Sequence, residues 1–427
     1  MKTFKELGLS REFVSALEKD RITTPSEIQE KAIPLVLTGR DVMCGSATGS
    51  GKTLVFASGI IENLKKDGKV QALVLTPTRE LAEQIANAIA KFSRHNNLKV
   101  LSIYGGVNII NQIRLLKNTD AVIGTPGRIL DHLNRGTLNL NNVNFLVLDE
   151  VDRMFDMGFK NDVEKILNKC QKKRQTVLFS ATLSSDIKPL ARKYTKNAVE
   201  VSVESYVDSS KLKQIYYDVP DGSKFSLLVH LLKKEKVQLV MVFCATRRNA
   251  DFVADNLNEF GIMAKAIHGG MEQNKRRKVL EEFNNPGGLN VLVCTDVAAR
   301  GLDIKEVSHV YNYDLPKTSE DYIHRIGRTA RAGKGGIAIS ILSSRDYDNI
   351  NNILRDEKLE IESVPIPQFE KLRMNVEKKG FANRGQRGRD RGRGRNQGGS
   401  NNRQSRGKNN SNRKYQGQRG NRNFGRR

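Results

Sequence analysis

The first informative stretch of the sequence is Ser46-Ala-Thr-Gly-Ser-Gly-Lys-Thr53, which lies between an apolar run at 41–45 and an apolar helical pattern beginning near Leu54. Glycines in such a strand–loop–helix setting let backbone N–H groups surround phosphate oxygens at a helix N-terminus. A lysine then reaches the terminal phosphates, and a threonine hydroxyl suits Mg²⁺. The stretch therefore predicts a P-loop for a nucleoside triphosphate, although Ser46 stands where the general pattern has its first glycine. The predicted nucleotide contacts are Ser46, Ala47, Thr48, Gly49, Ser50, Gly51, Lys52 and Thr53.

A second short strand carries the acidic residues that a P-loop requires. The stretch Phe145-Leu-Val-Leu-Asp149-Glu150 places two carboxylates directly after an apolar run. Asp149 is predicted to hold Mg²⁺ together with Thr53. Glu150 is predicted to orient or deprotonate the attacking water, because phosphoryl transfer is catalysed chiefly by positioning and charge stabilisation. An acidic helix N-cap after a strand is the alternative interpretation.

The pattern around these two stretches indicates parallel α/β domains. Short apolar, β-branched runs alternate with longer helical patterns, as in a doubly wound sheet whose faces are covered by crossover helices. The alternation occupies 1–203, breaks over the mostly polar 204–213 and restarts over 214–365. We predict two α/β domains joined by a linker, although a surface loop fits the composition of 204–213 equally well.

The composition separates a globular body from a basic C-terminal segment. The chain has 427 residues, of which 38% are apolar, and a net charge of +25. Residues 378–427 contain 17 Lys or Arg, one acidic residue and no Val, Ile, Leu, Met or Pro. Such a segment cannot build a core. We predict a disordered, basic, low-complexity tail over 366–427 that tethers nucleic acid.

The same composition argues against membrane, secreted and zinc-binding classes. No apolar run approaches the roughly 18 residues of a membrane span, and the N-terminus lacks the apolar stretch of a signal peptide. The chain has four cysteines, and no pair of them has the spacing of a zinc site. We expect a cytoplasmic protein with reduced, buried thiols and no membrane contact.

The order of these elements resembles the DEAD-box family of ATP-dependent RNA helicases. Asp149-Glu-Val-Asp152 is similar to the family's DEAD box, with Val151 in the usual alanine position. The resemblance extends from Phe4 to about residue 350. It implies two tandem RecA-like domains, with ATP and Mg²⁺ bound between them and RNA lying across both.

The resemblance also assigns further residues to ATP. Pro25-Ser-Glu-Ile-Gln29, together with Phe4, is similar to the family's Q motif, whose glutamine reads the adenine edge. ATP is therefore implied in preference to GTP, with Phe4 and Gln29 as contacts. The stretch 295–303 implies two more nucleotide contacts, Gly301 and Asp303.

Several short elements resemble the RNA-contacting motifs of the family. They are 77–82, 105–106, 125–128, 242–246, 268–276 and 295–303. The implied RNA contacts are Thr78, Arg79, Gly105, Gly106, Thr125, Gly127, Arg128, Thr246, Gln273, Arg276 and Thr295. Taken singly, each of the first three elements is also compatible with an ordinary strand-to-helix turn. Gly270 stands where the family usually has an aspartate, and His268 is alternatively an ordinary loop histidine.

The stretch His324-Arg-Ile-Gly-Arg328-Thr-Ala-Arg331 resembles the family's arginine-finger motif. It implies that Arg328 and Arg331 stabilise the transition state, so the catalytic set is these two arginines with Lys52 and Glu150. A surface basic helix is the alternative. Ala330 replaces a glycine, and alanine disfavours positive φ. If the family's glycine needs a left-handed conformation, we expect this turn to be reshaped.

Residues that couple ATP hydrolysis to duplex separation are implied by the same resemblance. They are Ser180, Thr182, Asp152 and His324. Taken alone, Ser180-Ala-Thr182 also fits a helix cap.

The function implied is RNA-stimulated hydrolysis of ATP to ADP and phosphate, coupled to local, sequence-independent RNA unwinding or RNP remodelling. We expect a monomer whose partners are RNA and ATP. Two alternatives stay open: an RNA chaperone or ATP-gated RNA clamp with little unwinding, and a DNA helicase.

Overall fold

The structure is a computed structural model of the chain. It describes residues 2–45, 50–180, 187–203, 212–234, 239–285, 287–299, 304, 307–330, 335–357 and 359–373. These residues form two seven-stranded sheets, in which neighbouring strands run parallel to each other. The predicted pair of parallel α/β domains is confirmed.

The first sheet has the strand order β3-β4-β2-β5-β6-β1-β7. Its strands are β1 (Val42–Gly45), β2 (Ala72–Leu75), β3 (Val100–Ile103), β4 (Ala121–Gly124), β5 (Phe145–Leu148), β6 (Gln175–Ser180) and β7 (Val199–Ser202). Its helices are α1 (Arg11–Lys19), α2 (Glu27–Leu37), α3 (Lys52–Asn63), α4 (Arg79–Phe92), α5 (Ile109–Leu116), α6 (Pro126–Asn134), α7 (Val151–Asp156), α8 (Lys160–Leu167) and α9 (Ile187–Tyr194).

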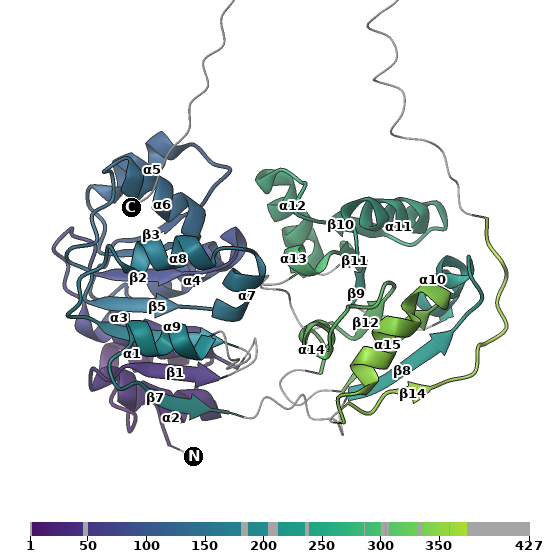
Figure 1. Ribbon diagram of the computed structural model, residues 1–427, viewed down its shortest axis with the longest axis horizontal. Helices are drawn as coiled ribbons and strands as arrows, with labels where there is room; N and C mark the ends of the chain where they lie inside the picture. Colours follow the sequence, from purple (N-terminus) through teal and green to yellow (C-terminus); the bar gives the residue numbers. More distant parts are fainter. Residues whose placement is uncertain are drawn as a thin grey trace, which may run out of the picture. The chain divides into compact units, whose positions relative to one another are not determined.

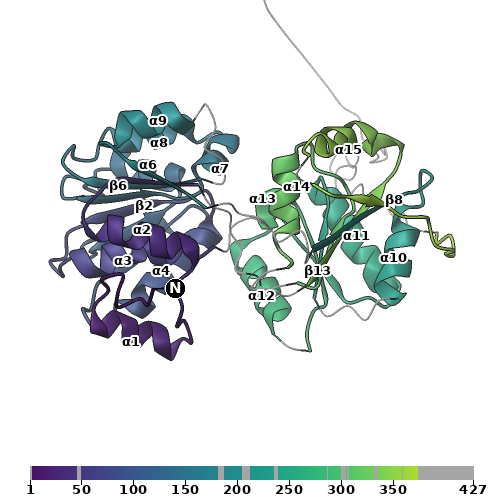
Figure 2. The ribbon, with the colours of Figure 1, turned by 90° about the horizontal axis from the view of Figure 1, so that it is seen from below.

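Alternate residues of each central strand face two different cores. In β5, Phe145 and Val147 lie in one core, and Leu146 and Leu148 lie in the other. Helices α1 to α4 pack on the first core and α5 to α9 on the second, so the sheet is covered on both faces (Figures 1 and 2). Strands covered on both faces must be apolar throughout, which explains the continuous hydrophobic runs.

The second sheet has the order β10-β11-β9-β12-β13-β8-β14. Its strands are β8 (Leu212–Asp218), β9 (Val240–Phe243), β10 (Ala264–Ile267), β11 (Val291–Cys294), β12 (His309–Asn312), β13 (Gly336–Leu342) and β14 (Glu362–Ser363). Its helices are α10 (Lys224–Lys234), α11 (Arg247–Glu259), α12 (Gln273–Asn284), α13 (Asp296–Ala299), α14 (Ser319–Ile326), η1 (Ser344–Asp346) and α15 (Tyr347–Leu354). Helices α10 and α11 pack on one core of this sheet, and α12 to α15 contribute to the cores on the other face.

The second domain reaches beyond the boundary predicted at 365. Phe369 and Leu372 pack against its core, and the backbone N–H of Leu372 donates to Ser226 Oγ on α10 at 3.0 Å. These two apolar residues stand in a mostly polar segment that the sequence analysis assigned to the tail. Strand β8 begins at Leu212, inside the predicted linker. Residues 204–211 of that linker and 374–427 of the predicted disordered tail lie outside the described residues.

In the described parts of the chain, no helix is long and apolar enough to cross a membrane. The four cysteines are buried free thiols.

Candidate functional site

The carboxyl ends of the central strands of the first sheet meet at one edge, where the predicted site residues follow. Leu75 of β2 pairs with Leu148 of β5 and Gly124 of β4, and Gly45 of β1 pairs with Ser180 of β6. Open parallel sheets bind their ligands at this edge.

The described part of the P-loop ends on a glycine with a left-handed backbone. Gly51 has φ +92° and caps the N-terminus of α3, whose first residue is the buried Lys52. A Cβ at Gly51 would lie 2.3 Å from Gln29 Nε2, so only glycine fits. Thr53 follows in the first turn of α3. The loop residues before Ser50 lie outside the described part of the chain.

The Q-motif glutamine contacts the P-loop directly. Gln29 Oε1 accepts from the backbone N–H of Ser26 (2.9 Å), and Gln29 Nε2 donates to Gly51 O (3.0 Å). Ser26 Oγ donates to Ser50 O at 2.7 Å. The oxygen and the nitrogen of the Gln29 side-chain amide are thus both engaged by the chain, and the contact of Gln29 with adenine stays a prediction. Phe4 is 2% exposed and lies in the first core, and its contact with ATP also stays a prediction.

The acidic pair is buried at the end of β5. Asp149 and Glu150 are 3% and 4% exposed. Asp149 Oδ1 and Glu150 Oε2 have no hydrogen-bond partner among the described residues. Burial raises the pKa of Asp149 to about 7, Lys52 opposes this rise, and the charge of Glu150 adds to it. A buried carboxylate with an unpaired oxygen fits a divalent cation, whose charge would offset the cost of burial.

The backbone at Glu150 is strained. Glu150 has φ +51° and ψ +56°, which places a residue with a Cβ in the left-handed region at the N-cap of α7. Its Oε2 lies 3.7 Å from Arg153 Nε, an ion pair longer than a hydrogen bond. Left-handed non-glycine residues cost about 1–3 kcal/mol and cluster at functional sites. This placement supports a role for Glu150 beyond helix capping.

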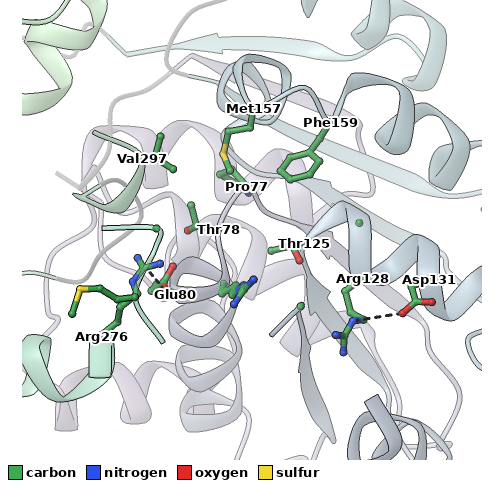
Figure 3. Close-up of a pocket in the computed structure, with 15 residues that line it drawn as sticks. Pro77, Thr78, Glu80, Thr125, Arg128, Asp131, Met157, Phe159, Arg276 and Val297 are labelled. Carbon is green, nitrogen blue, oxygen red and sulfur yellow. Dashed lines mark ion pairs between the residues drawn. The ribbon is translucent and has the colours of Figure 1, made fainter. Parts of the chain in front are cut away.

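A pocket of about 360 Å³ gathers most of the predicted RNA contacts (Figure 3). Those that line it are Thr78, Arg79, Gly105, Thr125, Gly127, Arg128 and Arg276. Thr78 is the N-cap of α4 after β2, and Thr125 is the N-cap of α6 after β4. Strand ends therefore bring hydroxyls, arginines and turn backbone from distant parts of the sequence to one hollow.

One acidic residue in this pocket was missed by the sequence analysis. Glu80 Oε1 lies 3.1 Å from Arg276 Nη2 and accepts from Gln273 Nε2 at 3.0 Å. Both of these predicted RNA contacts on α12 are thus bound to a carboxylate on α4. Burial lowers the pKa of Arg276, and Glu80 opposes that shift. The stretch 77–82 contains Glu80, but no sequence pattern indicates its distant partners.

The other two arginines of the pocket lie against the turn at 105–107, and hydrogen bonds hold Arg128 there. Gly106 has φ +83°, and a Cβ there would lie 2.1 Å from Arg79 Nη1, so glycine lets this arginine lie across the turn. Arg128 Nη1 donates to Val107 O (3.2 Å) and to Gln112 Oε1 (2.9 Å). Held side chains lose less entropy when they bind a phosphate.

The remaining predicted RNA contacts lie at the carboxyl edge of the second sheet. Thr246 is the N-cap of α11, and Thr295 immediately precedes α13. His268 Nε2 lies 2.8 Å from Asp251 Oδ1, and His268 Nδ1 accepts from the backbone N–H of Gly270 at 3.2 Å. His268 therefore has the contacts of an ordinary loop histidine.

The arginine-bearing motif occupies α14 and the turn that follows it. His324 lies on α14, and Arg328 is buried at the end of the turn. Reshaping of this turn was expected if the family's glycine needs a left-handed conformation. Ala330 itself has a left-handed backbone, with φ +55°. The turn thus retains the conformation that suits glycine, and Ala330 bears the strain.

Two more of the predicted coupling residues, Ser180 and Asp152, lie in the first domain. Ser180 is the buried last residue of β6, and Asp152 lies on α7, where its Oδ1 accepts from the backbone N–H of Arg153 at 2.9 Å. The predicted site residues that lie outside the described part of the chain are Ser46, Ala47, Thr48, Gly49, Thr182, Gly301, Asp303 and Arg331.

The fold and the site define a class of protein, the nucleoside triphosphatases built from two tandem RecA-like domains. A family model described as DEAD/DEAH box helicase matches residues 26–190. A second model, described as helicase conserved C-terminal domain, matches residues 223–333.

Curated relatives and solved structures agree with these models. The DEAD-box ATP-dependent RNA helicase CshA of Geobacillus kaustophilus is 43% identical over 87% of this chain and 80% of its own length. A probable ATP-dependent RNA helicase of Methanocaldococcus jannaschii is 43% identical over 84% of this chain and 97% of its own. The structure of S. cerevisiae Dbp5 bound to RNA and ADP BeF3 is 32% identical, with a TM-score of 0.79 over 86% of this chain and 96% of that chain.

The chain belongs to the family of DEAD-box ATP-dependent RNA helicases. The resemblance drawn from the sequence, the tandem RecA-like fold and the assignment as an ATP-dependent RNA helicase are confirmed.

Proposed function

We propose that this chain hydrolyses ATP at the edge of its first sheet and uses the hydrolysis to open RNA duplexes locally. The observation that carries the proposal is the buried pair Asp149 and Glu150. Burial raises the pKa of Asp149, and Lys52 is close enough for its charge to oppose that rise. Each carboxylate has an oxygen without a hydrogen-bond partner among the described residues. Buried carboxylate oxygens are normally hydrogen-bonded, and the ion pair of Glu150 Oε2 with Arg153 Nε is longer than a hydrogen bond at 3.7 Å. Both oxygens are therefore suited to contact a ligand.

Thr53 and Asp149 are the residues that would hold Mg²⁺. The ion would neutralise charge that develops on the phosphates. Lys52 would bind the terminal phosphates, and Glu150 would orient the attacking water through Oε2, which has no hydrogen-bond partner among the described residues. Gln29 would support the loop through Gly51 while its chemistry favours ATP over GTP.

The second domain would supply arginines that complete the catalytic set. Arg328 and Arg331 are assigned to the transition state, where a guanidinium stabilises charge on the transferred phosphoryl group. Hydrolysis would then require residues of both domains. RNA that binds residues of both domains favours their productive arrangement, so it would stimulate turnover by shifting that equilibrium.

RNA would bind through the pocket that Thr78, Arg79, Thr125, Arg128 and Arg276 line. Hydroxyls, arginines and turn backbone grip phosphate and ribose rather than base edges. Unwinding would therefore be independent of base sequence.

We further propose a cytoplasmic monomer whose partners are RNA and ATP, with the basic C-terminal segment as an RNA tether. An RNA chaperone or ATP-gated clamp would show ATP-dependent RNA binding with little strand separation. A DNA helicase would be stimulated by DNA as well as by RNA.

The test is steady-state ATP hydrolysis with RNA, with DNA and with neither, repeated with GTP, together with single-turnover separation of a short RNA duplex. RNA should stimulate ATP turnover, whereas DNA should stimulate it little and GTP should be hydrolysed slowly.

Glu150→Gln should nearly abolish turnover and leave ATP affinity unchanged, whereas Lys52→Ala should weaken both turnover and ATP affinity. Equal loss of nucleotide affinity in Glu150→Gln would exclude the water-positioning role. Strand separation no faster than in the absence of ATP would favour the clamp.

A further inference from the structure

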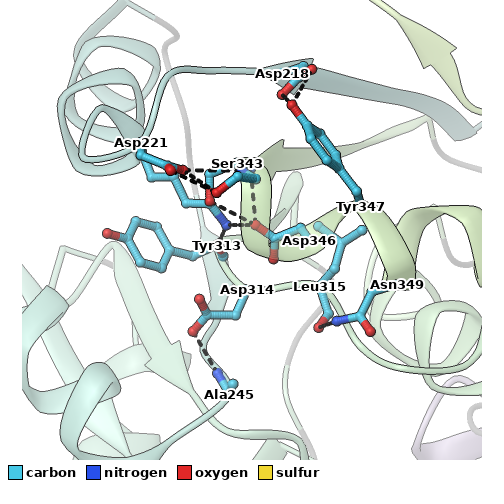
Figure 4. Close-up of polar contacts among 12 residues, drawn as sticks. Asp218, Asp221, Ala245, Tyr313, Asp314, Leu315, Ser343, Asp346, Tyr347 and Asn349 are labelled. Atoms are coloured by element: carbon cyan, nitrogen blue, oxygen red, sulfur yellow. Dashed lines mark hydrogen bonds and ion pairs between the residues drawn. The ribbon is translucent and has the colours of Figure 1, made fainter.

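One carboxylate at the carboxyl edge of the second sheet contacts the turn that carries a predicted RNA residue (Figure 4). Asp314 lies two residues after β12, and its backbone N–H donates to Phe243 O at the end of β9 (3.1 Å). Its Oδ2 accepts from the backbone N–H of Ala245 (2.8 Å) and from Asn249 Nδ2 (2.6 Å). A single carboxylate oxygen thus joins β12 to the loop between β9 and α11.

The two donors stand on either side of Thr246 in the sequence. Thr246 is the N-cap of α11, and its Oγ1 accepts from the backbone N–H of Asn249 at 3.1 Å. Hydrogen bonds to an ionised acceptor are stronger and more directional than neutral ones. Asp314 therefore fixes the turn from which the hydroxyl of Thr246 is presented to RNA.

The main chain of Asp314 contacts a second motif. Its carbonyl oxygen accepts from Arg325 Nη1 at 2.5 Å. Arg325 lies on α14 and is 2% exposed, with its guanidinium 5.1 Å from the ring centroid of Phe243. Arg325 was not assigned a role by the sequence analysis, although it lies inside the stretch 324–331.

The same guanidinium holds the start of α13. Arg325 Nε and Nη2 bind the two carboxylate oxygens of Asp296 at 2.6 Å and 2.7 Å, a bidentate pair. Thr295, a predicted RNA contact, precedes Asp296, and Arg328 lies three residues after Arg325, in the turn where its backbone N–H donates to Arg325 O at 3.1 Å. Bidentate pairs fix geometry as well as contributing energy. A displacement of Asp314 would therefore shift the turn at Thr246, through the bonds of the Asp314 side chain. It would also shift Arg328, through the bond of Arg325 to the Asp314 carbonyl.

We propose that Asp314 is a positioning residue that connects the RNA contact at Thr246 to the arginine-bearing helix α14. RNA binding and ATP turnover depend on each other through this residue. The inference rests on the proposed roles of Thr246 and Arg328, and its test is designed to separate its failure from theirs.

The chain offers a matched control at the same sheet edge. Asp221 accepts from the backbone N–H of Ser344 (3.2 Å to Oδ1) and from Ser344 Oγ (2.7 Å to Oδ2). Figure 4 shows Asp221 and Asp314 in one view. Each carboxylate receives a backbone and a side-chain donor, but Ser344 belongs to no predicted ATP or RNA motif. Asp221→Ala therefore removes similar bonds without touching the proposed connection.

The experiment compares Asp314→Ala with Asp221→Ala in the full chain. The measured quantities are turnover without RNA, turnover at saturating RNA, the RNA concentration at half-saturation, and the thermal midpoint. We expect Asp314→Ala to raise half-saturating RNA about tenfold and to lower RNA-stimulated turnover about tenfold, the size expected for a lost charged hydrogen bond. Asp221→Ala should leave all three kinetic quantities within about twofold, with a fall in the thermal midpoint comparable to that of Asp314→Ala.

Asp314→Asn keeps one acceptor for the N–H of Ala245 and should fall between wild type and Asp314→Ala. If Asp314→Ala does not fold, the same comparison with Asp221→Ala is made with Asp314→Asn. Kinetics of Asp314→Ala equal to those of Asp221→Ala would overturn the inference, as would an effect on RNA affinity or on stimulated turnover alone. Thr246→Val tests the RNA role itself. If that variant binds RNA like wild type, the proposed function of Thr246 fails; if it binds weakly while Asp314→Ala is normal, only the inference on Asp314 fails.

Discussion

Asp149 is a buried carboxyl group whose protonation competes with metal binding. Burial raises its pKa to about 7, and the neighbouring Glu150 adds to that rise. A raised pKa means that the protonated form predominates below pH 7, whereas Mg²⁺ binds the carboxylate. We expect Mg²⁺ affinity to be nearly constant above pH 7 and to fall by up to about tenfold for each pH unit below it. Calorimetric titration of Mg²⁺ with a non-hydrolysable ATP analogue between pH 6 and 8 measures this.

Glu150→Gln is the control for that pH dependence. It removes the negative charge that helps to raise the pKa of Asp149 and keeps the side chain nearly isosteric. The inflection should therefore move to lower pH, and binding rather than turnover reports it. An Mg²⁺ affinity that does not change across this range would show that Asp149 is not a ligand.

Ala330 carries backbone strain that a glycine would relieve. Its φ of +55° is left-handed, a conformation that costs a residue with a Cβ about 1–2 kcal/mol. The methyl group of Ala330 packs against the cluster of buried residues that includes Tyr322 and Ile326. Loss of this packing in a glycine variant offsets part of the stability gained by relieving the strain. We expect Ala330→Gly to raise the free energy of unfolding by about 1 kcal/mol. Urea unfolding followed by circular dichroism measures the difference.

Ala338→Gly makes the same chemical change at a buried strand position of the same cluster. No positive φ occurs there, so the variant should lose about 1 kcal/mol through backbone entropy and the lost methyl group. If Ala330→Gly destabilises the protein as Ala338→Gly does, the strain at Ala330 is not significant.

At the scale of elements, the N-terminus of α2 supports the N-terminus of α3. Gln29 joins them through its bond to Gly51 O and its bond from the N–H of Ser26. We expect Gln29→Ala to raise the KM for ATP by about tenfold, because the loop loses a buried hydrogen bond and a cap. Steady-state kinetics with ATP and with GTP measure the effect.

The two nucleotides separate the two roles of Gln29. A residue that only supports the loop would weaken ATP and GTP equally. A residue that also reads adenine would weaken ATP more and erode the preference between them. Wild-type protein that hydrolyses GTP as well as ATP would contradict the adenine role outright.

Elements with one dominant local pattern were predictable from the sequence. The strands 42–45 and 145–148 are covered on both faces, so they are apolar throughout and can be recognised from their composition. Asp149 and Glu150 directly follow the second of them, at the edge of the sheet that binds ligands. The partners of Glu80 and Asp314 were not predictable, because each contact joins residues far apart in the chain. The packing of Phe369 was also missed, since one aromatic residue in a polar segment gives no periodic pattern.

At the scale of the whole molecule, the charge is concentrated where no motif lies. Residues 378–427 hold a net +16 of the chain's +25, and none of the predicted catalytic or RNA residues. The second domain contains Phe369 and Leu372, so a cut that tests the basic segment must fall after them. A chain ending at Glu377 keeps the whole packed segment, whereas one ending at Pro365 removes part of the core.

We expect the chain ending at Glu377 to keep its RNA-stimulated turnover at saturating RNA but to need more RNA to reach it. Each phosphate that the basic segment neutralises adds about 0.7 to the slope of log affinity against log salt on single strands. Truncation should therefore flatten that slope, which RNA titrations at several salt concentrations measure. The chain ending at Pro365 should instead lose thermal stability, because Phe369 and Leu372 leave the core. If the chain ending at Glu377 keeps both the salt slope and the half-saturating RNA of the full chain, the basic segment does not bind RNA and its charge serves another partner.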